Sequence, residues 1–417
     1  MKILLLNQTF YPDNVATAQQ TADLARFLAK EGHEVSVICD SRSYECRTRI
    51  FKREENWCGV KVFRLLTTGF GKRRLRYRLL DSFSFFVSAF FKLTQFPRQD
   101  LVISFTSPPL VGVLGTLFCL FRGGESIQWL MDINPDSAFQ VGYLKRKSFL
   151  GRALNSLLEF TLTRAKYVVV LDRWMKETAI KHGALEASVV VIPPWSVFKE
   201  DEPGLEESVR AFKKEHQLEN KFLVLYSGNH SVVHPLDTLL ETARCLRADE
   251  TVLFLFIGAG LRTKDVSDYK TKHGLTNIRQ LPLQPREKVK ASFGAADLHC
   301  VVMGSGMSGL VHVSKVYSVL ASGKPFVFVG PSESHIGDLI QENQLGEQVE
   351  WGNNQDFIKA IQRIRALNPS DHKAIKTKSH QVVREYEPEL TLRKFYKEVI
   401  ESDQRGSVPL SYEVSIP

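Results

Sequence analysis

The chain has 417 residues, a length that suits two domains of about 200 residues each better than one core. Hydrophobic residues make up 43% and charged residues 24%, which is ordinary for a globular protein, and the six cysteines include no Cys-x-x-Cys pair, so we expect reduced, mostly buried thiols. The formal net charge is +9, and residues 42–98 alone carry 14 Lys and Arg against 4 Asp and Glu, an excess that favours an anionic surface, either lipid or nucleic acid, as a partner.

The first apolar run, Ile3–Leu6, is too short for the core of a signal peptide and is predicted to be a buried first strand. No uncharged apolar run reaches the roughly 18 residues of a membrane-spanning helix. We therefore expect a cytoplasmic protein that does not cross a bilayer.

The first half of the chain alternates apolar runs with helical patterns. A helix is predicted over Thr17–Lys30, where apolar side chains recur at helical spacing before Gly32. Several of the apolar runs are continuous, which is typical of strands covered on both faces. The predicted strands are Lys2–Leu6, Glu34–Cys39, Val60–Leu65, Leu101–Phe105, Ser126–Met131, Tyr167–Leu171 and Val189–Ile192. The pattern predicts a Rossmann-like domain over residues 1–195.

The segment Lys72–Leu93, KRRLRYRLLDSFSFFVSAFFKL, begins with five basic side chains in seven positions and continues as a predicted helix. Its polar positions, Asp81, Ser84, Ser88 and Lys92, form one narrow stripe, and nearly all the others are apolar. This pattern favours a helix lying in the headgroup plane of an anionic membrane. A core helix that covers the sheet explains the Phe residues equally well, but it does not explain the Arg cluster. Since no nucleic-acid-binding motif accompanies the cluster, we expect no nucleic-acid partner.

A second series of elements follows a change of pattern near Pro193. The polar stretch Lys199–Glu219 is the predicted linker, with a helix in its second half. Another helix is predicted over Leu236–Leu246, between strands at Phe222–Tyr226, Val252–Ile257, Asn277–Leu281, Leu298–Val302 and Phe326–Val329. We expect a second Rossmann-like domain over residues 196–385, and over residues 386–417 a C-terminal helix that crosses back to the first domain, followed by a tail. Two such tandem domains place a cleft between them, where small-molecule sites usually lie.

Glycine-containing loops follow three strands of the second half. They contain Gly228, then Gly258 and Gly260, and then the stretch that leads to Ser314 and Lys315 at the start of a helix. Unpaired backbone N–H groups at such a helix start point at anions, so the unit over Ala296–Pro331 is predicted to hold a phosphate or diphosphate. An ordinary βαβ repeat has the same spacing. No loop continues as GK[ST], which disfavours a P-loop, and a dinucleotide fingerprint is missing from the first loop.

Several segments match a known family in order and spacing. They are Asn7–Val35, Ser104–Gly112, Trp129–Leu144, Tyr226–Ala243, Phe254–Gly260, Asn277–Val289, Ala295–Val302 and Ser314–Val327. On these segments the chain resembles the retaining GT-B glycosyltransferases of the family 4 type, especially the bacterial surface-polysaccharide branch. The resemblance covers nearly the whole length.

The resemblance implies transfer of a sugar from a nucleotide-activated donor, usually a uridine diphosphate sugar, with no obligatory metal. It places the nucleotide in the second domain and the acceptor in the first. It also implies positions for the residues of the three loops: Gly228 and Asn229 near the donor diphosphate, Gly258 and Gly260 beside the base or ribose, and Ser314 and Lys315 facing the phosphates.

Two acidic residues are candidates on the acceptor side. Asp132 and Asp136 end a first-domain strand, and the resemblance implies that they orient or deprotonate the acceptor hydroxyl. Asn-Pro-Asp is also strong turn chemistry, so a purely structural turn is an equal alternative.

The sequence departs from the family pattern where charge is expected. Ser318 stands where many relatives have a glutamate that binds the ribose, and the partner glutamate falls near Leu310. Asn229 and His234 stand where many relatives have Arg and Lys. Because His234 is largely neutral at pH 7, the hold on a diphosphate is expected to be weaker.

Other polar residues near these loops are weaker candidates. His230, in the loop after the first strand of the second domain, is a candidate catalytic residue, although a lone histidine is more often structural. His299 and His312 lie near the same loops in sequence. Glu333, after the last Gly-Pro turn, is a candidate to contact the donor sugar or else part of a solvated loop.

The leading hypothesis is a glycosyltransferase, peripheral on the inner face of the cytoplasmic membrane, that moves a sugar from a nucleotide sugar to a glycan or polyprenyl-linked acceptor. A catalytically silent relative that binds a nucleotide sugar or serves as a scaffold is the alternative, motivated by Ser318, Asn229 and His234. A nucleotide-sugar epimerase on the same fold would need an acid and base pair that the sequence does not display.

Overall fold

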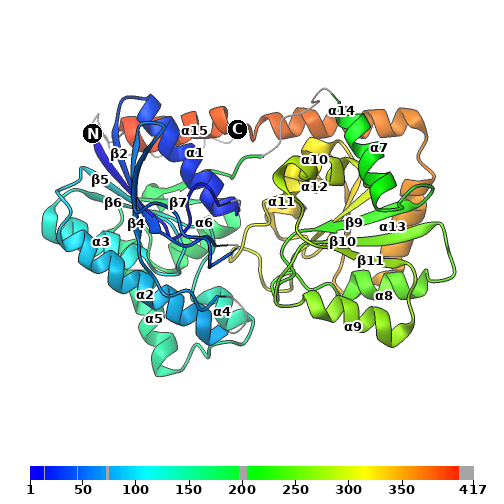
Figure 1. The fold of residues 1–417 in the computed structure, drawn as a ribbon, viewed down its shortest axis with the longest axis horizontal. Coiled ribbons are helices and arrows are strands. Elements are labelled where there is room, and N and C mark those ends of the chain that lie inside the picture. The colour runs from blue at the N-terminus through cyan, green and yellow to red at the C-terminus, as the bar shows by residue number, and fades with distance from the viewer. Residues whose placement is uncertain (14, 45, 72–74, 197–203, 403–417) are drawn as a thin grey trace, which may run out of the picture. The chain divides into compact units, whose positions relative to one another are not determined.

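The computed structural model describes residues 1–13, 15–44, 46–71, 75–196 and 204–402, which form two compact units (Figure 1). The first unit comprises Met1–Pro194, Gly309–His312 and the chain from Pro388 onward, and the second comprises Trp195–Ser308 and Val313–Glu387. The basic residues Lys72, Arg73 and Arg74, part of the predicted linker and the tail from residue 403 lie outside the described residues.

The first unit is built on an eight-stranded sheet with the order β3-β4-β2-β1-β5-β6-β7-β8. All neighbours are parallel except β3 and β4, which form an antiparallel hairpin at one edge. The strands are β1 (Lys2–Leu6), β2 (Glu34–Asp40), β3 (Glu54–Trp57), β4 (Val60–Leu65), β5 (Leu101–Ser104), β6 (Glu125–Trp129), β7 (Tyr167–Val170) and β8 (Val189–Val191).

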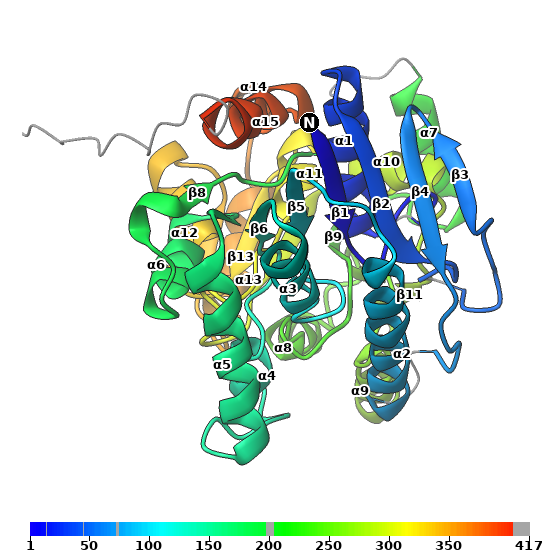
Figure 2. The same ribbon diagram turned by 90° about the vertical axis from the view of Figure 1, so that its left-hand side faces the viewer.

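Helices cover both faces of this sheet (Figure 2). Helices α1 and α15 contact each other on one face, while α3 packs between α2 and α5 on the other. The helices of the first unit are α1 (Ala16–Lys30), α2 (Leu75–Thr94), α3 (Gly112–Arg122), α4 (Asp136–Gln140), α5 (Phe149–Arg164), α6 (Arg173–Lys181), the 3₁₀ turn η1 (Glu186–Ser188), α15 (Pro388–Phe395) and the π-helical turn η2 (Tyr396–Glu401).

Two later segments of the chain complete the first unit. Phe395 packs on Trp129 of β6 with ring centroids 4.9 Å apart, so the C-terminal helix lies on the first sheet. Leu310 accepts a hydrogen bond of 2.8 Å from the backbone of Ile133, and Val311 forms a bridge with Asp132. The segment Gly309–His312 therefore groups with the first unit, although the sequence placed it in the second domain.

The second unit is built on a six-stranded, fully parallel sheet with the order β11-β10-β9-β12-β13-β14. Its strands are β9 (Phe222–Ser227), β10 (Val252–Ile257), β11 (Ile278–Leu281), β12 (Leu298–Val302), β13 (Phe326–Val329) and β14 (Glu347–Val349). Its helices are α7 (Leu205–Glu215), α8 (Asp237–Cys245), α9 (Thr263–His273), α10 (Arg286–Gly294), α11 (Lys315–Ser322), α12 (His335–Asn343), α13 (Asn354–Arg365) and α14 (Pro369–Arg384).

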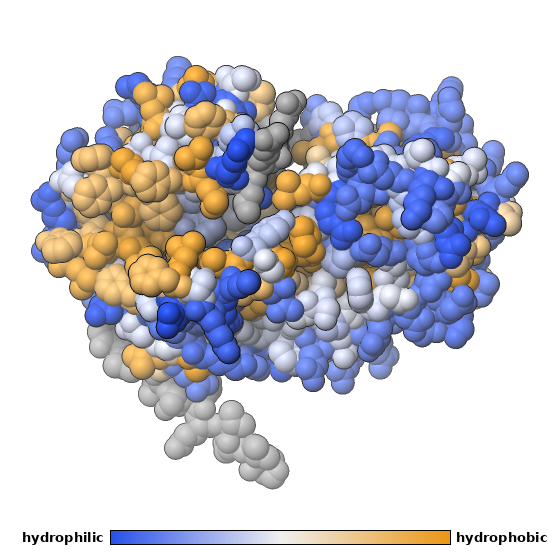
Figure 3. All heavy atoms as spheres, turned by 90° about the horizontal axis from the view of Figure 1, so that it is seen from below, coloured by the Kyte–Doolittle hydropathy of each residue, from blue (hydrophilic) through white to orange (hydrophobic). Residues whose placement is uncertain are grey.

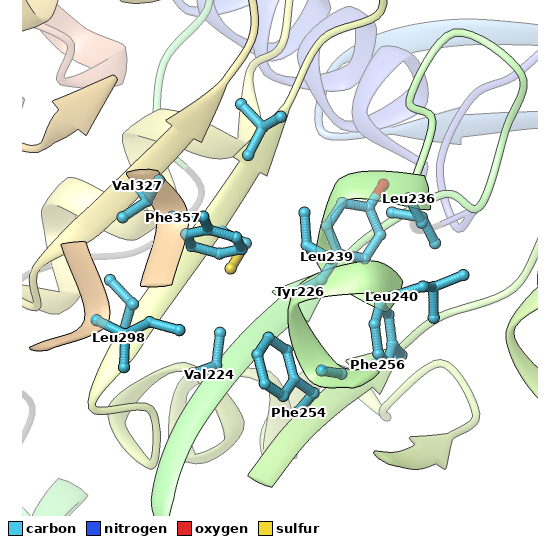
Figure 4. Packing of buried hydrophobic residues seen from close by; sticks show 14 of the residues in the cluster. Val224, Tyr226, Leu236, Leu239, Leu240, Phe254, Phe256, Leu298, Val327 and Phe357 are labelled. Atoms are coloured by element: carbon cyan, nitrogen blue, oxygen red, sulfur yellow. The ribbon is translucent and has the colours of Figure 1, made fainter. Parts of the chain in front are cut away.

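The period of two along β9 divides the core of the second unit between the two faces of its sheet. Val224 and Tyr226 enter one cluster, which also contains side chains of α8 and α13 (Figure 4). Leu223 and Leu225 enter a second cluster on the other face, with side chains of α7 and α10. The central strand is therefore held from both sides, and its carboxyl end is a rigid base for the loop that follows.

The predicted α/β architecture with two parallel sheets is confirmed, and each predicted strand is present. Two strands were missed. β3 is a four-residue edge strand, Glu-Glu-Asn-Trp, with its glutamates and asparagine at least partly exposed, and β14 has only three residues. Edge strands this short and polar carry no apolar run from which they can be predicted.

The polar stripe of helix α2 faces the rest of the protein. Asp81 is buried and accepts hydrogen bonds from the backbone N–H groups of Phe70 and Gly71, at 3.1 and 3.0 Å. The hydroxyl of Ser84 bonds to Thr68, and that of Ser88 donates to the Leu66 carbonyl. The apolar positions opposite this stripe therefore point away from the sheet.

Part of the basic excess in residues 42–98 is internal. Arg47 forms ion pairs with Asp40, at 2.9 Å, and Asp81, at 3.6 Å, and Arg64 pairs with Glu55 at 2.6 Å. The side chain of Arg64 is buried and that of Arg47 is only 12% exposed, so both arginines serve mainly to hold this edge of the sheet together. No helix in the described part of the chain is long and apolar enough to cross a membrane.

Candidate functional site

The carboxyl edge of the second sheet has a topological switch point at β9. This strand pairs with β10 on one side and with β12 on the other, so the chain leaves β9 and β12 toward opposite edges. In open parallel sheets, ligands bind outside the carboxyl ends of the strands at such a point. The loops after β9, β10 and β12 are the three that the sequence singled out.

Glycines allow the first two of these loops to touch. Gly228 has φ +149° and Gly258 has φ +135°, and a Cβ on Gly258 would lie 2.0 Å from the Gly228 carbonyl oxygen. A Cβ on Gly260 would lie 2.2 Å from the His230 carbonyl oxygen. Hydrogen bonds from Gly228 N to Ile257 O and from His230 N to Ala259 O, at 2.9 and 3.1 Å, join the loops. No other residue fits these close approaches without moving the backbone.

Lys315, the first residue of α11, brings the third loop to the same place. Its ammonium donates a hydrogen bond of 3.1 Å to the Tyr226 hydroxyl and lies 4.2 Å from the Tyr226 ring centroid. A Cβ on Gly228 would lie 2.6 Å from Lys315 Nζ, so the ammonium is directly beside the glycine loop. Within the described residues no carboxylate pairs with Lys315, and burial lowers the pKa of its ammonium to about 7. An ammonium in this state has a strong electrostatic preference for an anion beside it.

Tyr226 is a site residue that the sequence analysis missed. Its side chain is 1% exposed, and its hydroxyl donates to the Asn229 carbonyl at 2.9 Å while accepting from Lys315. The tyrosine thus fixes the loop after β9 and the lysine of α11 in one geometry. The signal was a tyrosine within an apolar strand next to a glycine loop, because a buried hydroxyl needs a partner.

Two histidines beside Lys315 are neutral. Desolvation and the nearby Lys315 ammonium lower the pKa of His230 to about 4 and that of His234 to about 3. Both ring nitrogens of His230 are buried, and neither has a hydrogen-bond partner among the described residues; the same holds for Nδ1 of His234. The hydroxyls of Ser231, in the same loop, and of Thr263, the first residue of α9, are also buried with no hydrogen-bond partner among the described residues. Buried polar atoms without partners in these loops, near an ammonium that no described carboxylate neutralises, indicate a site for a polar, anionic ligand.

The remaining donor-side candidates lie at different depths. Asn229 is exposed beside the touching glycine loops, and Ser314 is half-buried as the N-cap of α11 with its hydroxyl making no capping bond. Ser318 is buried one turn into α11. Glu333 is exposed before α12. Structure and sequence thus bring Gly228, Gly258 and Lys315 together, whereas Glu333 has no contact that ties it to this group.

The two acidic candidates of the first unit differ in environment. Asp132 is exposed after β6, at the rim of a hollow of about 20 Å³ lined by residues that include Leu110, Gln128 and Leu158. Asp136 is buried at the start of α4, where His182 Nε2 lies 2.9 Å from one oxygen and Arg146 bonds to the other. Burial alone would raise the pKa of Asp136, but these two partners lower it below its usual value. Desolvation raises the pKa of Asp132 to about 6, whereas Asp136 is held in its charged form by its partners.

His312 and His299 have structural partners. His312 Nδ1 lies 2.7 Å from Asp172, whose other oxygen caps α6 by accepting from Met175 N at 2.8 Å. His299 is buried in β12 with Nε2 at 3.1 Å from the Phe293 carbonyl. The first pair belongs to the first unit, because His312 lies in the segment Gly309–His312.

Comparisons with known proteins agree with this architecture. Residues 16–195 match a family model described as a glycosyl transferase 4-like domain. The chain is 27% identical over 360 residues to WcaI of Escherichia coli K12, named as a colanic acid biosynthesis glycosyl transferase, which covers 82% of this chain and 86% of that protein. It is also 27% identical over 259 residues to WbjE of Pseudomonas aeruginosa, named as a glycosyltransferase, which covers 61% and 64% of the two chains.

Solved structures show the same fold. The crystal structure of Anabaena Alr3699/HepE in complex with UDP-glucose covers 96% of this chain and 100% of that one, with a TM-score of 0.70 at 14% identity. At this identity the likeness concerns the fold alone.

The contact between Gly258 and Gly228 predicts a large cost for a side chain there. Gly258→Ala is expected to lower the free energy of unfolding in urea by about 2–4 kcal/mol, because its methyl group would meet a backbone oxygen and its φ would be strained. Gly274→Ala is the matched control, since Gly274 also has a positive φ, +60°, but nothing lies near its Cβ position. This variant should lose only about 1 kcal/mol. Equal losses in the two variants would mean that the close approach of the loops is not a constraint.

Proposed function

We propose that this chain is a glycosyltransferase of the GT-B fold and the family 4 type, and that it transfers a sugar from a uridine diphosphate sugar to a glycan or polyprenyl-linked acceptor in surface-polysaccharide biosynthesis. The observation that carries the proposal is the half-buried Lys315 ammonium at the switch point of the second sheet, for which the described part of the chain offers no carboxylate partner. A diphosphate is the ligand whose charge suits this place.

Each loop of the second unit has a proposed part in donor binding. The touching loops at Gly228 and Gly258 are proposed to hold the diphosphate, with Asn229, Gly260 and Ser314 beside it. Lys315 stabilises the charge that develops on the leaving diphosphate, which is the main electrostatic demand of this reaction. Ser318 and Glu333 are proposed to lie toward the ribose and the donor sugar. Since Lys315 supplies positive charge, we propose that no metal is obligatory.

The neutral His230 is proposed to act beside the donor. Its two ring nitrogens are without partners in a buried position, so one can donate a hydrogen bond and the other can accept one. His234, with its lowered pKa, contributes a hydrogen bond and no charge to the same ligand. These are contacts that a sugar hydroxyl or a phosphate oxygen can make.

The acceptor side is proposed to use Asp132. An exposed carboxylate at the carboxyl end of β6 can orient the acceptor hydroxyl or take its proton. The ion-paired state of Asp136 supports a structural role for that residue. Retention of the sugar's configuration is proposed from the family resemblance alone, and NMR of the product's anomeric proton tests it.

A polyprenyl-linked acceptor lies in a bilayer, so we propose peripheral attachment to the inner face of the cytoplasmic membrane. The relative WcaI is named for colanic acid biosynthesis, and this name supports a surface polysaccharide as the product. The support from this chain is the outward apolar face of α2, where Phe83 and Phe91 are 67% and 60% exposed.

A catalytically silent, nucleotide-sugar-binding relative is the second candidate. Neutral His234 and uncharged Asn229 give the diphosphate less fixed charge than the family pattern implies. Turnover separates the two candidates: hydrolysis or transfer of the bound UDP-sugar supports an enzyme, and saturable binding without turnover in the presence of lipid-linked acceptors supports the silent relative.

Lys315→Met is expected to weaken UDP binding by about tenfold to a hundredfold, because one charge-assisted contact is lost. Isothermal titration calorimetry measures this change. The matched control is Lys324→Met, since Lys324 is also half-buried but lies before β13, at the opposite edge of the sheet. This variant should bind UDP like the wild type. Unchanged binding by Lys315→Met would overturn the proposed donor site.

The lowered pKa of Lys315 also predicts a pH dependence. Above about pH 7 the free protein holds this amine largely neutral, so binding the diphosphate should take up a proton. The affinity for UDP is expected to fall as the pH rises from about 7 to 9, and the calorimetric heat at pH 8 should depend on the ionisation enthalpy of the buffer. Neither effect should survive in Lys315→Met.

Asp132→Asn and Asp136→Asn are expected to fail in different ways. Asp132→Asn should lower kcat by about a hundredfold or more with an unchanged melting temperature, because an exposed general base is lost. Asp136→Asn should lower the free energy of unfolding by about 1–3 kcal/mol, since a buried charged partner of His182 is removed. Full activity of Asp132→Asn would contradict its proposed role.

A further inference from the structure

An apolar surface lies on the outward side of three helices of the first unit (Figure 3). We call it the three-helix surface. It consists of Leu79, Leu80, Phe83, Val87, Phe90 and Phe91 of α2, Leu120 and Phe121 of α3, and Phe149, Leu150 and Leu157 of α5. Phe121 and Phe149 are each 84% exposed. Contiguous apolar patches of this kind mark interaction sites, because soluble proteins rarely leave them open.

The orientation of α2 is fixed from inside. Asp81 accepts hydrogen bonds from two backbone N–H groups and lies 3.6 Å from Arg47. Ser84 and Ser88 form hydrogen bonds with the preceding loop. Turning the helix to bury Phe83 and Phe90 would break this network and expose Phe85. The apolar side of α2 is therefore a permanent outer face.

The loop before α5 gives the surface a second charged border, which the sequence analysis did not identify. Lys145, Arg146 and Lys147 precede Phe149 and Leu150, and Arg152 follows them. Lys145, Lys147 and Arg152 are exposed, whereas Arg146 is held by Asp136. Basic side chains thus adjoin exposed apolar ones here, as they do at Arg76 and Arg78 of α2.

Acidic groups are nearly absent from the three helices. Among their described residues the acids are Asp81, which is buried, and Glu159, which accepts a hydrogen bond from Asn155. Arg122 borders the surface at the end of α3, where it donates to the Thr94 carbonyl. An apolar face with a basic border is complementary to a bilayer with anionic headgroups.

We propose that the three-helix surface seats the first unit on an anionic bilayer, with α2 and the segment Lys145–Arg152 as two separate contacts. This inference rests on the proposed function, in which the acceptor is lipid-linked, and it adds the second contact and the side chains that insert. Phe149 and Leu150 enter the interface, and Lys145 and Lys147 bind lipid phosphates. A symmetric dimer through this face would place two basic borders against each other, which is electrostatically unfavourable.

Flotation of the full chain with vesicles tests the proposal. The wild type is expected to float with vesicles of 70% phosphatidylcholine and 30% phosphatidylglycerol, and to bind at least tenfold less to pure phosphatidylcholine. Raising the salt concentration should weaken binding, because the phosphate contacts are screened. Absence of binding to either vesicle would overturn the proposal.

Three variants separate the two contacts. Phe149→Ser with Leu150→Ser, Phe83→Ser with Phe90→Ser, and Lys145→Gln with Lys147→Gln should each bind anionic vesicles at least fivefold less. The control is Leu283→Ser, which removes an apolar side chain of similar exposure, 58%, from the second unit and should bind like the wild type. Wild-type binding by the first or third variant would overturn the second contact, and equal loss in the control would overturn the assignment to this surface.

Two further measurements keep the outcomes distinct. Circular dichroism checks that the variants are folded, which we expect because the replaced side chains are exposed. UDP calorimetry should give wild-type affinity in every variant, so a failure of membrane binding leaves the proposed donor site standing. Concentration-dependent dimerisation of the wild type, lost in the Phe83 and Phe90 variant and accompanied by no vesicle binding, would assign the surface to a second copy and overturn the proposal.

Discussion

The proposed chemistry of this protein depends on a lysine ammonium for which the described residues provide no carboxylate partner. Lys315 lies at the first turn of α11, and the Tyr226 hydroxyl holds it in place at 3.1 Å. The backbone contact between Gly228 and Gly258 brings two loops together beside it, and a side chain at Gly258 would collide with the Gly228 carbonyl oxygen. A side chain at Gly258 would push the two loops apart, and loss of the Tyr226 hydroxyl would remove the hydrogen bond that positions the Lys315 ammonium. The proposed donor site therefore depends on several residues at the switch point of the second sheet.

Much of this could be predicted from the sequence, because continuous apolar runs and glycines after strands have local physical causes. The positions of Gly228, Gly258 and Lys315 followed from the rule that carboxyl ends of parallel strands share one edge. Tyr226 could not be placed, since its partner lies 89 residues away in the chain. The ion pairs of Asp136 involve residues as distant in the chain as His182, so the burial and pairing of this carboxylate could not be predicted either.

Helix α2 shows how a correct pattern can leave its orientation open. The narrow polar stripe at Asp81, Ser84 and Ser88 was evident, but a stripe does not say whether it faces water or protein. Loop 66–71 decides this, because its backbone N–H and C=O groups need partners and the stripe supplies them. The basic residues of 42–98 divide for a similar reason, since Arg47 pairs with the buried Asp40 and Arg64 pairs with the partly exposed Glu55.

A crystal structure of the protein with UDP would test the central claim most directly. The account predicts that the diphosphate lies at the Gly228 and Gly258 loops with a phosphate oxygen within hydrogen-bond distance, about 3 Å, of Lys315 Nζ. It also predicts that a ring nitrogen of His230 gains a partner. A diphosphate bound elsewhere, with Lys315 still contacting only Tyr226, would contradict the account.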